Sequence, residues 1–222
     1  MQSIKPKWIK RIFVLILVIF ISYILYLNSL VKSQFSSEIE PKDNVVQIQN
    51  LIDDYPKELI NMLLLVEDQS FFDHKGVDFK EILRVLYGYL FEEKELRGAS
   101  TITQQLIKNT LLSRDKTLAR KTDEALMAIL MEMSYDKNFI LERYMNTVYL
   151  AQQGSTAIHG FASGSLHYFD KDVESLNLEE MATLVALLKG PSYYNPVNSP
   201  DRLNRRVEMI LSMHKNYKKI IQ

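Results

Sequence analysis

The sequence predicts a mainly α-helical domain attached to a membrane by one N-terminal helix. Residues 12–31 form an almost uninterrupted apolar run. Beyond that run, apolar residues recur at helical spacing and few stretches alternate as strands do. Residues typical of helix starts also precede several apolar segments. Since 222 residues suit one domain with a sizeable core, we expect a single helical domain and its anchor.

The apolar run is long enough to cross a membrane. At about 1.5 Å per residue, roughly 20 residues span a hydrocarbon core of about 30 Å. The run is preceded by Lys5, Lys7, Lys10 and Arg11. Because cations concentrate on the inner side, 1–11 is predicted to be a cytoplasmic tail and the later chain to lie outside. A cleaved signal peptide is the alternative, but its apolar region is usually only about 7–15 residues long. We expect a single-pass protein of the cytoplasmic membrane.

The charge balance and the absence of cysteine argue against nucleic acid and against cysteine-bound metal as ligands. The chain has 27 basic and 27 acidic residues, so without the four N-terminal cations the outer part retains 23 basic residues and carries about −4. No general nucleic-acid surface is therefore expected. The absence of cysteine excludes disulfides and cysteine metal sites. The four histidines lack zinc-ligand spacing, so no protein metal site is predicted.

After a polar stalk at 32–48, the domain at 49–222 is expected to be a series of helices. The expected helices are 56–66, 79–95, 100–111, 117–133, 137–149, 177–190 and one that begins at 199–200. Ser100, Asn177 and Ser199 are suitable N-caps, and Gly190 precedes a proline that ends a helix. The segment 154–169 is rich in Gly, Ser and His and is expected to be loose or broken by turns.

The first candidate site residue closes the apolar helix at 56–66. Glu67 follows Leu-Leu-Leu-Val and precedes Asp68. An apolar setting and a neighbouring carboxylate both disfavour the charged form of a carboxylate, which suits a general acid or base. The alternative is an acidic helix end with exposed charges. His74 and Gly76 follow in a turn, where either can simply pack or cap.

The second candidate is the polar helix start at Ser100. Free N–H groups at a helix start attract anions, and Ser100 and Thr101 add hydroxyl donors. Gln104 and Lys108 lie one turn apart and would share a face with them, while Gln105 belongs to the same polar run. The alternative is an ordinary capped helix with a solvated polar face.

A third cluster comprises Arg120, Lys121 and Glu124. Their spacing is most often that of surface ion pairs. The functional alternative is a pyrophosphate clamp beside a second carboxylate. Further along, Glu142 and Asn146 lie one turn apart, where buried hydrogen bonds between helices explain them as well as substrate contact does.

Taken in order, these segments resemble the peptidoglycan glycosyltransferases, a family with a lysozyme-like fold that includes monofunctional transglycosylases and domains of class A penicillin-binding proteins. The matching motifs are EDQSFFDHKG at 67–76, GASTITQQLIKN at 98–109, RKTDE at 120–124, KNFILERYMN at 137–146 and LLKGPSYYNP at 187–196. The resemblance implies a lysozyme-like large lobe and a smaller, membrane-proximal jaw lobe. The apolar stretch 83–91 falls in the jaw, which would dip into the bilayer.

The resemblance also implies a reaction: polymerisation of lipid II onto a growing glycan strand, with inversion and release of undecaprenyl pyrophosphate. Glu67 matches the general base and Glu124 the second acidic residue. The substrate-binding residues implied are Asp68, Ser100, Thr101, Gln104, Gln105, Lys108, Arg120, Lys121 and Asn146. No cofactor is required, although a divalent cation (Mg²⁺ or Mn²⁺) at the pyrophosphate is expected as an aid. Membrane lipid and other cell-wall synthesis proteins are the expected partners.

Two stretches depart from the family pattern. LAQQGS at 150–155 stands where many relatives carry Phe-Gly and further glycines, and Asp170 replaces a common turn glycine. The conformation of 150–170 is therefore open. The chain stops about twenty residues after 199–200, so a monofunctional enzyme without covalent penicillin binding is expected. The alternatives are a glycan-cleaving, lysozyme-like lytic enzyme, which has no pyrophosphate to bind, and a catalytically silent membrane-anchored cell-wall scaffold.

Overall fold

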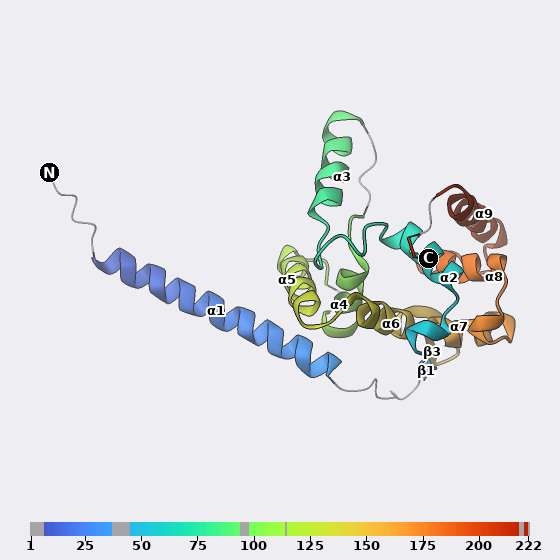
Figure 1. Cartoon of the computed structure of the whole chain (residues 1–222), viewed down its shortest axis with the longest axis horizontal. Coiled ribbons are helices and arrows are strands. Elements are labelled where there is room, and N and C mark those ends of the chain that lie inside the picture. The colour runs from blue at the N-terminus through green and yellow to red at the C-terminus, as the bar shows by residue number, and fades with distance from the viewer. Residues whose placement is uncertain (1–6, 37–44, 94–97, 114, 218–219, 222) are drawn as a thin grey trace.

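A computed structural model describes residues 7–36, 45–93, 98–113, 115–217 and 220–221 of the chain, and it is mainly helical (Figure 1). Its first helix, α1 (Lys7–Phe35), is long and apolar enough to cross a membrane. The predicted N-terminal apolar helix is thus confirmed, but it extends beyond 12–31 at both ends. Its last turn occupies the start of the predicted stalk.

The domain contains the predicted helices, most of them with bounds within two or three residues of expectation. They are α2 (Lys57–Glu67), α3 (Phe79–Phe91), α4 (Ile102–Leu111), α5 (Leu118–Ser134), α6 (Lys137–Thr147), α8 (Leu178–Leu187) and α9 (Pro200–Asn216). Asn177 and Glu180 form the expected capping box at the start of α8. Ser199 precedes α9 without a side-chain capping bond, so Pro200 marks that helix start alone.

A three-stranded sheet is the main feature that the sequence did not predict. Its strands β1 (Val45–Gln47), β2 (Tyr149–Gln153) and β3 (Thr156–His159) lie in the order β1-β3-β2, with β1 parallel and β2 antiparallel to β3. The expectation of a stalk through residue 48 is therefore wrong at its end, because β1 belongs to the domain. Residues 37–44 lie outside the described part.

The segment 154–169 is also more ordered than expected. It contains β3 and the helix α7 (Phe161–Phe169), whose first five residues are buried. Gly160 joins the two with φ +84°, and a Cβ there would lie 2.6 Å from the carbonyl oxygen of Asn146. Only glycine fits this turn, because it tolerates positive φ and needs no side-chain space.

The core places α2 at its centre. Leu59, Met62, Leu63 and Leu64 are fully buried, and α2 packs against α8 and α9. Because the body of the helix is fixed on several sides, its C-terminal residue, Glu67, is held in a defined place.

Helix α3 is the opposite case, since it stands out from the rest of the domain (Figure 1). Only Gly88 on it is buried. Leu83 is 65% exposed and Phe91 is 71% exposed. The other exposed large apolar residues of α3 are Phe79, Ile82, Leu86, Tyr87, Tyr89 and Leu90. An apolar surface of this kind marks an interaction with a membrane or a partner.

Candidate active site

A cleft of about 1110 Å³ opens where the end of α2, the loop 68–78, the start of α3 and the segment 98–101 meet. Glu67 and Ser100 are among the residues that line it. The structure therefore brings together the two segments that the sequence singled out first, although they are some thirty residues apart in the chain.

Glu67 is half-buried at the end of α2 and is held by an amide. Gln105 Nε2 donates a hydrogen bond to Glu67 Oε2 at 2.9 Å, and the Tyr144 hydroxyl donates to Gln105 Oε1 at 3.1 Å. Burial, and then the charges of Glu67 and Asp68, raise the pKa of Tyr144, so its hydroxyl remains a donor at neutral pH. Tyr144 thereby orients the amide so that its NH₂ group faces the carboxylate.

Asp68 does not point freely into the cleft, although it contributes to its wall. Its side chain is buried; His74 Nε2 lies 3.1 Å from both carboxylate oxygens, and the backbone N–H of Ile102 donates to Oδ2 at 2.9 Å. Asp68 therefore ties the loop after α2 to the first turn of α4. Its substrate contact remains a prediction, while its structural bonds are visible.

The N-cap of α4 is Thr101 rather than Ser100, which corrects the predicted helix start. Thr101 Oγ1 accepts from the backbone N–H of Gln104, and the Gln104 side chain accepts from the N–H of Thr101. The same hydroxyl donates to the carbonyl oxygen of Gly76 at 2.7 Å. Thr101 and Gln104 are each 2% exposed, so both serve the helix start and neither forms an open polar face. Ser100 and Thr101 both line the cleft, but these bonds occupy the Thr101 hydroxyl.

Arg120, Lys121 and Glu124 gather on the first turns of α5. Arg120 Nη1 lies 2.7 Å from Glu124 Oε2, and Lys121 Nζ pairs with Glu124 Oε1. The Glu124 side chain is 1% exposed, so a solvated surface ion pair is the wrong description of this cluster. Lys121 Nζ also donates to Ser100 Oγ at 2.8 Å, which brings its 44%-exposed side chain to the edge of the cleft. Two cations and one carboxylate leave one net positive charge there.

Besides the buried Gln104, the predicted binding residues Lys108 and Asn146 are not brought to this cluster. Lys108 is exposed further along α4 and is not among the residues that line the cleft. Asn146 is 3% exposed, and its amide bonds the backbone N–H and carbonyl of Asn50 and the hydroxyl of Tyr55. Of the two explanations left open for Asn146, the structure favours the structural one.

A buried ionic cluster beneath the cleft was missed from the sequence. His74 Nδ1 lies 3.7 Å from Glu132 Oε1, which accepts from Thr103 Oγ1 at 2.6 Å. The other Glu132 oxygen lies 2.7 Å from Lys137 Nζ. Burial lowers the pKa of Lys137, while the bond to Glu132 opposes this shift. The available signal was Glu132 between two methionines on α5, an unusual place for a charge.

The residues present do not fit a protein-bound divalent ion. In the described part of the chain, no three His, Asp or Glu side chains come together as a metal-binding group. Both oxygens of Glu124 already face cations. Lys121 and Arg120 supply positive charge beside Ser100, and Lys75, Lys80 and Arg84 line the cleft itself.

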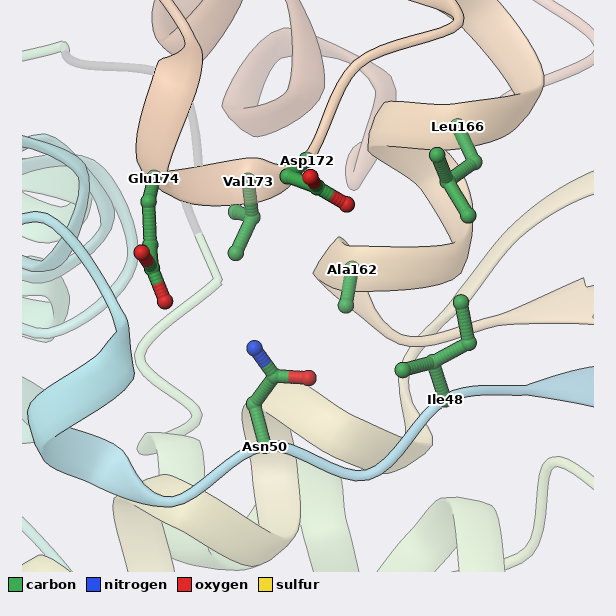
Figure 2. Close-up of a pocket in the computed structure, with 7 residues that line it drawn as sticks. All are labelled: Ile48, Asn50, Ala162, Leu166, Asp172, Val173 and Glu174. Carbon is green, nitrogen blue, oxygen red and sulfur yellow. The ribbon is translucent and has the colours of Figure 1, made fainter.

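A second, smaller cavity of about 150 Å³ lies away from this cleft, between the segment after β1, α7 and the turn at 172–174 (Figure 2). Ala162, Leu166 and Val173 give it an apolar wall, and the carboxylates of Asp172 and Glu174 stand at its rim (Figure 2). None of the predicted site residues lines it.

Comparison with known proteins places the chain in a family. A sequence model described as Transglycosylase matches residues 33–215. Penicillin-binding protein 1B of Haemophilus influenzae is 41% identical over 178 residues, which is 80% of this chain and 23% of that protein. Penicillin-binding protein 1B of Escherichia coli is 42% identical, and the match covers 72% of this chain and 19% of that protein. Penicillin-binding protein 1F of Bacillus subtilis is 39% identical, and the match covers 73% of this chain and 22% of that protein. The chain thus spans about a fifth of the length of these relatives. It belongs to the transglycosylase family.

Proposed function

We propose that this protein is a peptidoglycan glycosyltransferase that polymerises lipid II at the outer face of the cytoplasmic membrane. The observation that carries the proposal is the pairing, around one cleft, of a supported carboxylate with a net positive cluster. Glu67 lines the cleft, and Ser100 connects the cleft to Lys121. A sugar hydroxyl and a sugar pyrophosphate require these two kinds of group.

In the proposed reaction, Glu67 takes the proton from the 4-hydroxyl of the acceptor sugar. The freed oxygen attacks the anomeric carbon of the growing strand from the face opposite the leaving group. The bond from that carbon to the pyrophosphate oxygen breaks, so the configuration inverts and the lipid pyrophosphate departs. Lys121 and Arg120 stabilise the negative charge that develops on the leaving group.

The two carboxylates have different tasks in this scheme. Glu124 is buried and has an ion pair on each oxygen, so it orients Arg120 and Lys121 and is not available as a base. Glu67 is half-buried and borders the cleft, with Gln105 fixing its direction. A positioned general base contributes about 10²- to 10⁴-fold to rate. A divalent cation carried by the pyrophosphate itself remains a prediction.

Membrane contact is part of the proposal because the substrate is lipid-linked. α1 supplies a helix long enough to span the bilayer, and the exposed apolar surface of α3 supplies a second contact. Replacing Leu86, Leu90 and Phe91 by Ser should lower both vesicle binding and turnover. Unchanged binding and turnover would contradict a role of α3 in the membrane.

The deciding experiment offers the purified protein two substrates in parallel. With labelled lipid II in detergent, it should produce glycan strands. With purified peptidoglycan, it should release no soluble fragments, since the cation cluster suits a pyrophosphate that a lytic enzyme does not bind. Release of fragments without polymer would favour the lytic alternative, and inactivity on both would favour the silent scaffold.

A further inference from the structure

Helix α1 is more than a tether, because its outer end packs on the helix that carries Arg120, Lys121 and Glu124. Leu27, Val31 and Phe35 are 3%, 0% and 4% exposed and belong to the domain core, although most of α1 before them is exposed. They recur every four residues, so they form one stripe along the helix. The packing partners are α5 and, less extensively, α4.

Two further contacts fix the relative position of α1 and α5. The Tyr23 hydroxyl donates to Asp123 Oδ1 near the start of α5, and the rings of Phe35 and Tyr135 meet edge-on at 6.4 Å at its end. The two helices therefore run parallel over twelve residues, or about 18 Å. In the sequence, Asp123 lies between Lys121 and Glu124, so the contact with α1 is next to the ion pairs at the start of α5.

The lengths involved locate this contact at the outer membrane surface. Trp and Tyr concentrate at the two membrane interfaces. Trp8 and Tyr26 are eighteen residues apart, roughly 27 Å along a helix, which is close to a hydrocarbon core of about 30 Å. With Trp8 at the inner interface, Tyr26 reaches the outer one, Tyr23 lies about one helical turn below it, and the stripe from Leu27 to Phe35 begins there and continues outward. The first residue of α5, Leu118, is 89% exposed and would face the lipid.

We infer that α1 is a positioning element for the reaction. Through Tyr23–Asp123 and the stripe of Leu27, Val31 and Phe35, it holds the first turns of α5 at headgroup depth. Lys121 then meets the pyrophosphate of a membrane-embedded substrate at the level where that group lies. This inference rests on the proposed function, but it concerns residues outside the cleft.

Point substitutions test the polar contact. Tyr23→Phe and Asp123→Leu remove the hydrogen bond, and each should lower kcat/KM for lipid II in vesicles by roughly threefold to tenfold, mainly through KM. Asp123→Asn keeps an acceptor oxygen and should stay within about twofold of wild type. Tyr26→Phe, the same change on the exposed side of α1, is the matched control and should leave the rate unchanged. Hydrogen exchange of the backbone amides at 120–124 should be faster than wild type in Tyr23→Phe and unchanged in Tyr26→Phe.

Replacing α1 by another membrane helix tests whether the packing of α1 on α5 matters as a whole. An unrelated single-pass helix of equal length should keep the protein in the vesicle but lower kcat/KM, and grafting Tyr, Leu, Val and Phe at positions 23, 27, 31 and 35 should restore it. The inference is overturned if the foreign anchor supports full activity, or if Tyr23→Phe matches Tyr26→Phe in rate and exchange. A wild type that makes no polymer would instead contradict the proposed function, and the exchange measurement would still test the contact.

Discussion

Replacing Gly76 by Ala should destabilise the protein, because it forces the loop 68–78 away from α5. Gly76 has φ +85°, and a Cβ there would lie 2.5 Å from both the carbonyl carbon and the oxygen of Ala128 on α5. Positive φ costs a non-glycine residue about 1–2 kcal/mol, and overpacking against immovable backbone costs about 1–3 kcal/mol. The expected loss of unfolding free energy is therefore roughly 2–5 kcal/mol. At about 2–4 °C per kcal/mol for a domain of this size, Tm should fall by roughly 4–20 °C.

Two other glycines separate these contributions in the same thermal unfolding assay. Gly154 has φ +59° with nothing within 4 Å of a Cβ, so Gly154→Ala should cost only the backbone term of about 1–2 kcal/mol. Gly98 has open space and no such φ, so Gly98→Ala should change Tm little. The account of a close approach between the loop and α5 fails if Gly76→Ala is no more destabilising than Gly154→Ala.

Three further substitutions examine the groups around the cleft. Gln105→Leu removes the donor to Glu67 and should lower kcat by roughly tenfold, measured as strand synthesis from lipid II; an unchanged kcat would show that the amide does not orient the base. The same change leaves the buried Tyr144 hydroxyl without its acceptor, so the free energy of unfolding should also fall by about 1–3 kcal/mol. Lys137→Met leaves the buried carboxylate of Glu132 without its cation and should cost about 3 kcal/mol in urea unfolding, and a neutral result would contradict that pairing. Asn146→Leu removes the protein hydrogen bonds of a buried amide and should lower Tm strongly. Wild-type stability with a raised KM in that variant would instead support substrate contact.

The helices, and the position of Glu67 at a helix end, could be predicted because their signals are local. Asn177 and Glu180 lie within four residues of each other and predict a capping box. The apolar run before Glu67 predicts a helix that ends at this carboxylate. The helix start at Thr101 was misplaced by one residue, because Ser100 and Thr101 are equally good caps by residue type. Only the long-range bond from Thr101 to Gly76 distinguishes them.

The features that could not be predicted depend on residues far apart in the chain. β1 has three residues, and its pairing joins Val45 to Ala157, so neither segment carries enough alternation to reveal a strand. The contact of Tyr23 with Asp123 spans one hundred residues between a membrane helix and a domain helix. Residues of these kinds are ordinary in isolation, and their role follows only from the fold.

The most direct test of the central claim is the initial rate of strand synthesis from lipid II by Glu67→Gln. This variant keeps the size of the side chain and removes the basic oxygen, so the rate should fall by about 10²- to 10⁴-fold, while Tm and lipid II binding stay close to those of wild type. Asp73→Asn is the matched control, since Asp73 is an exposed carboxylate that lines the same cleft, and it should retain wild-type activity. A Glu67→Gln protein that polymerises lipid II as fast as Asp73→Asn would contradict the assignment of Glu67 as the base.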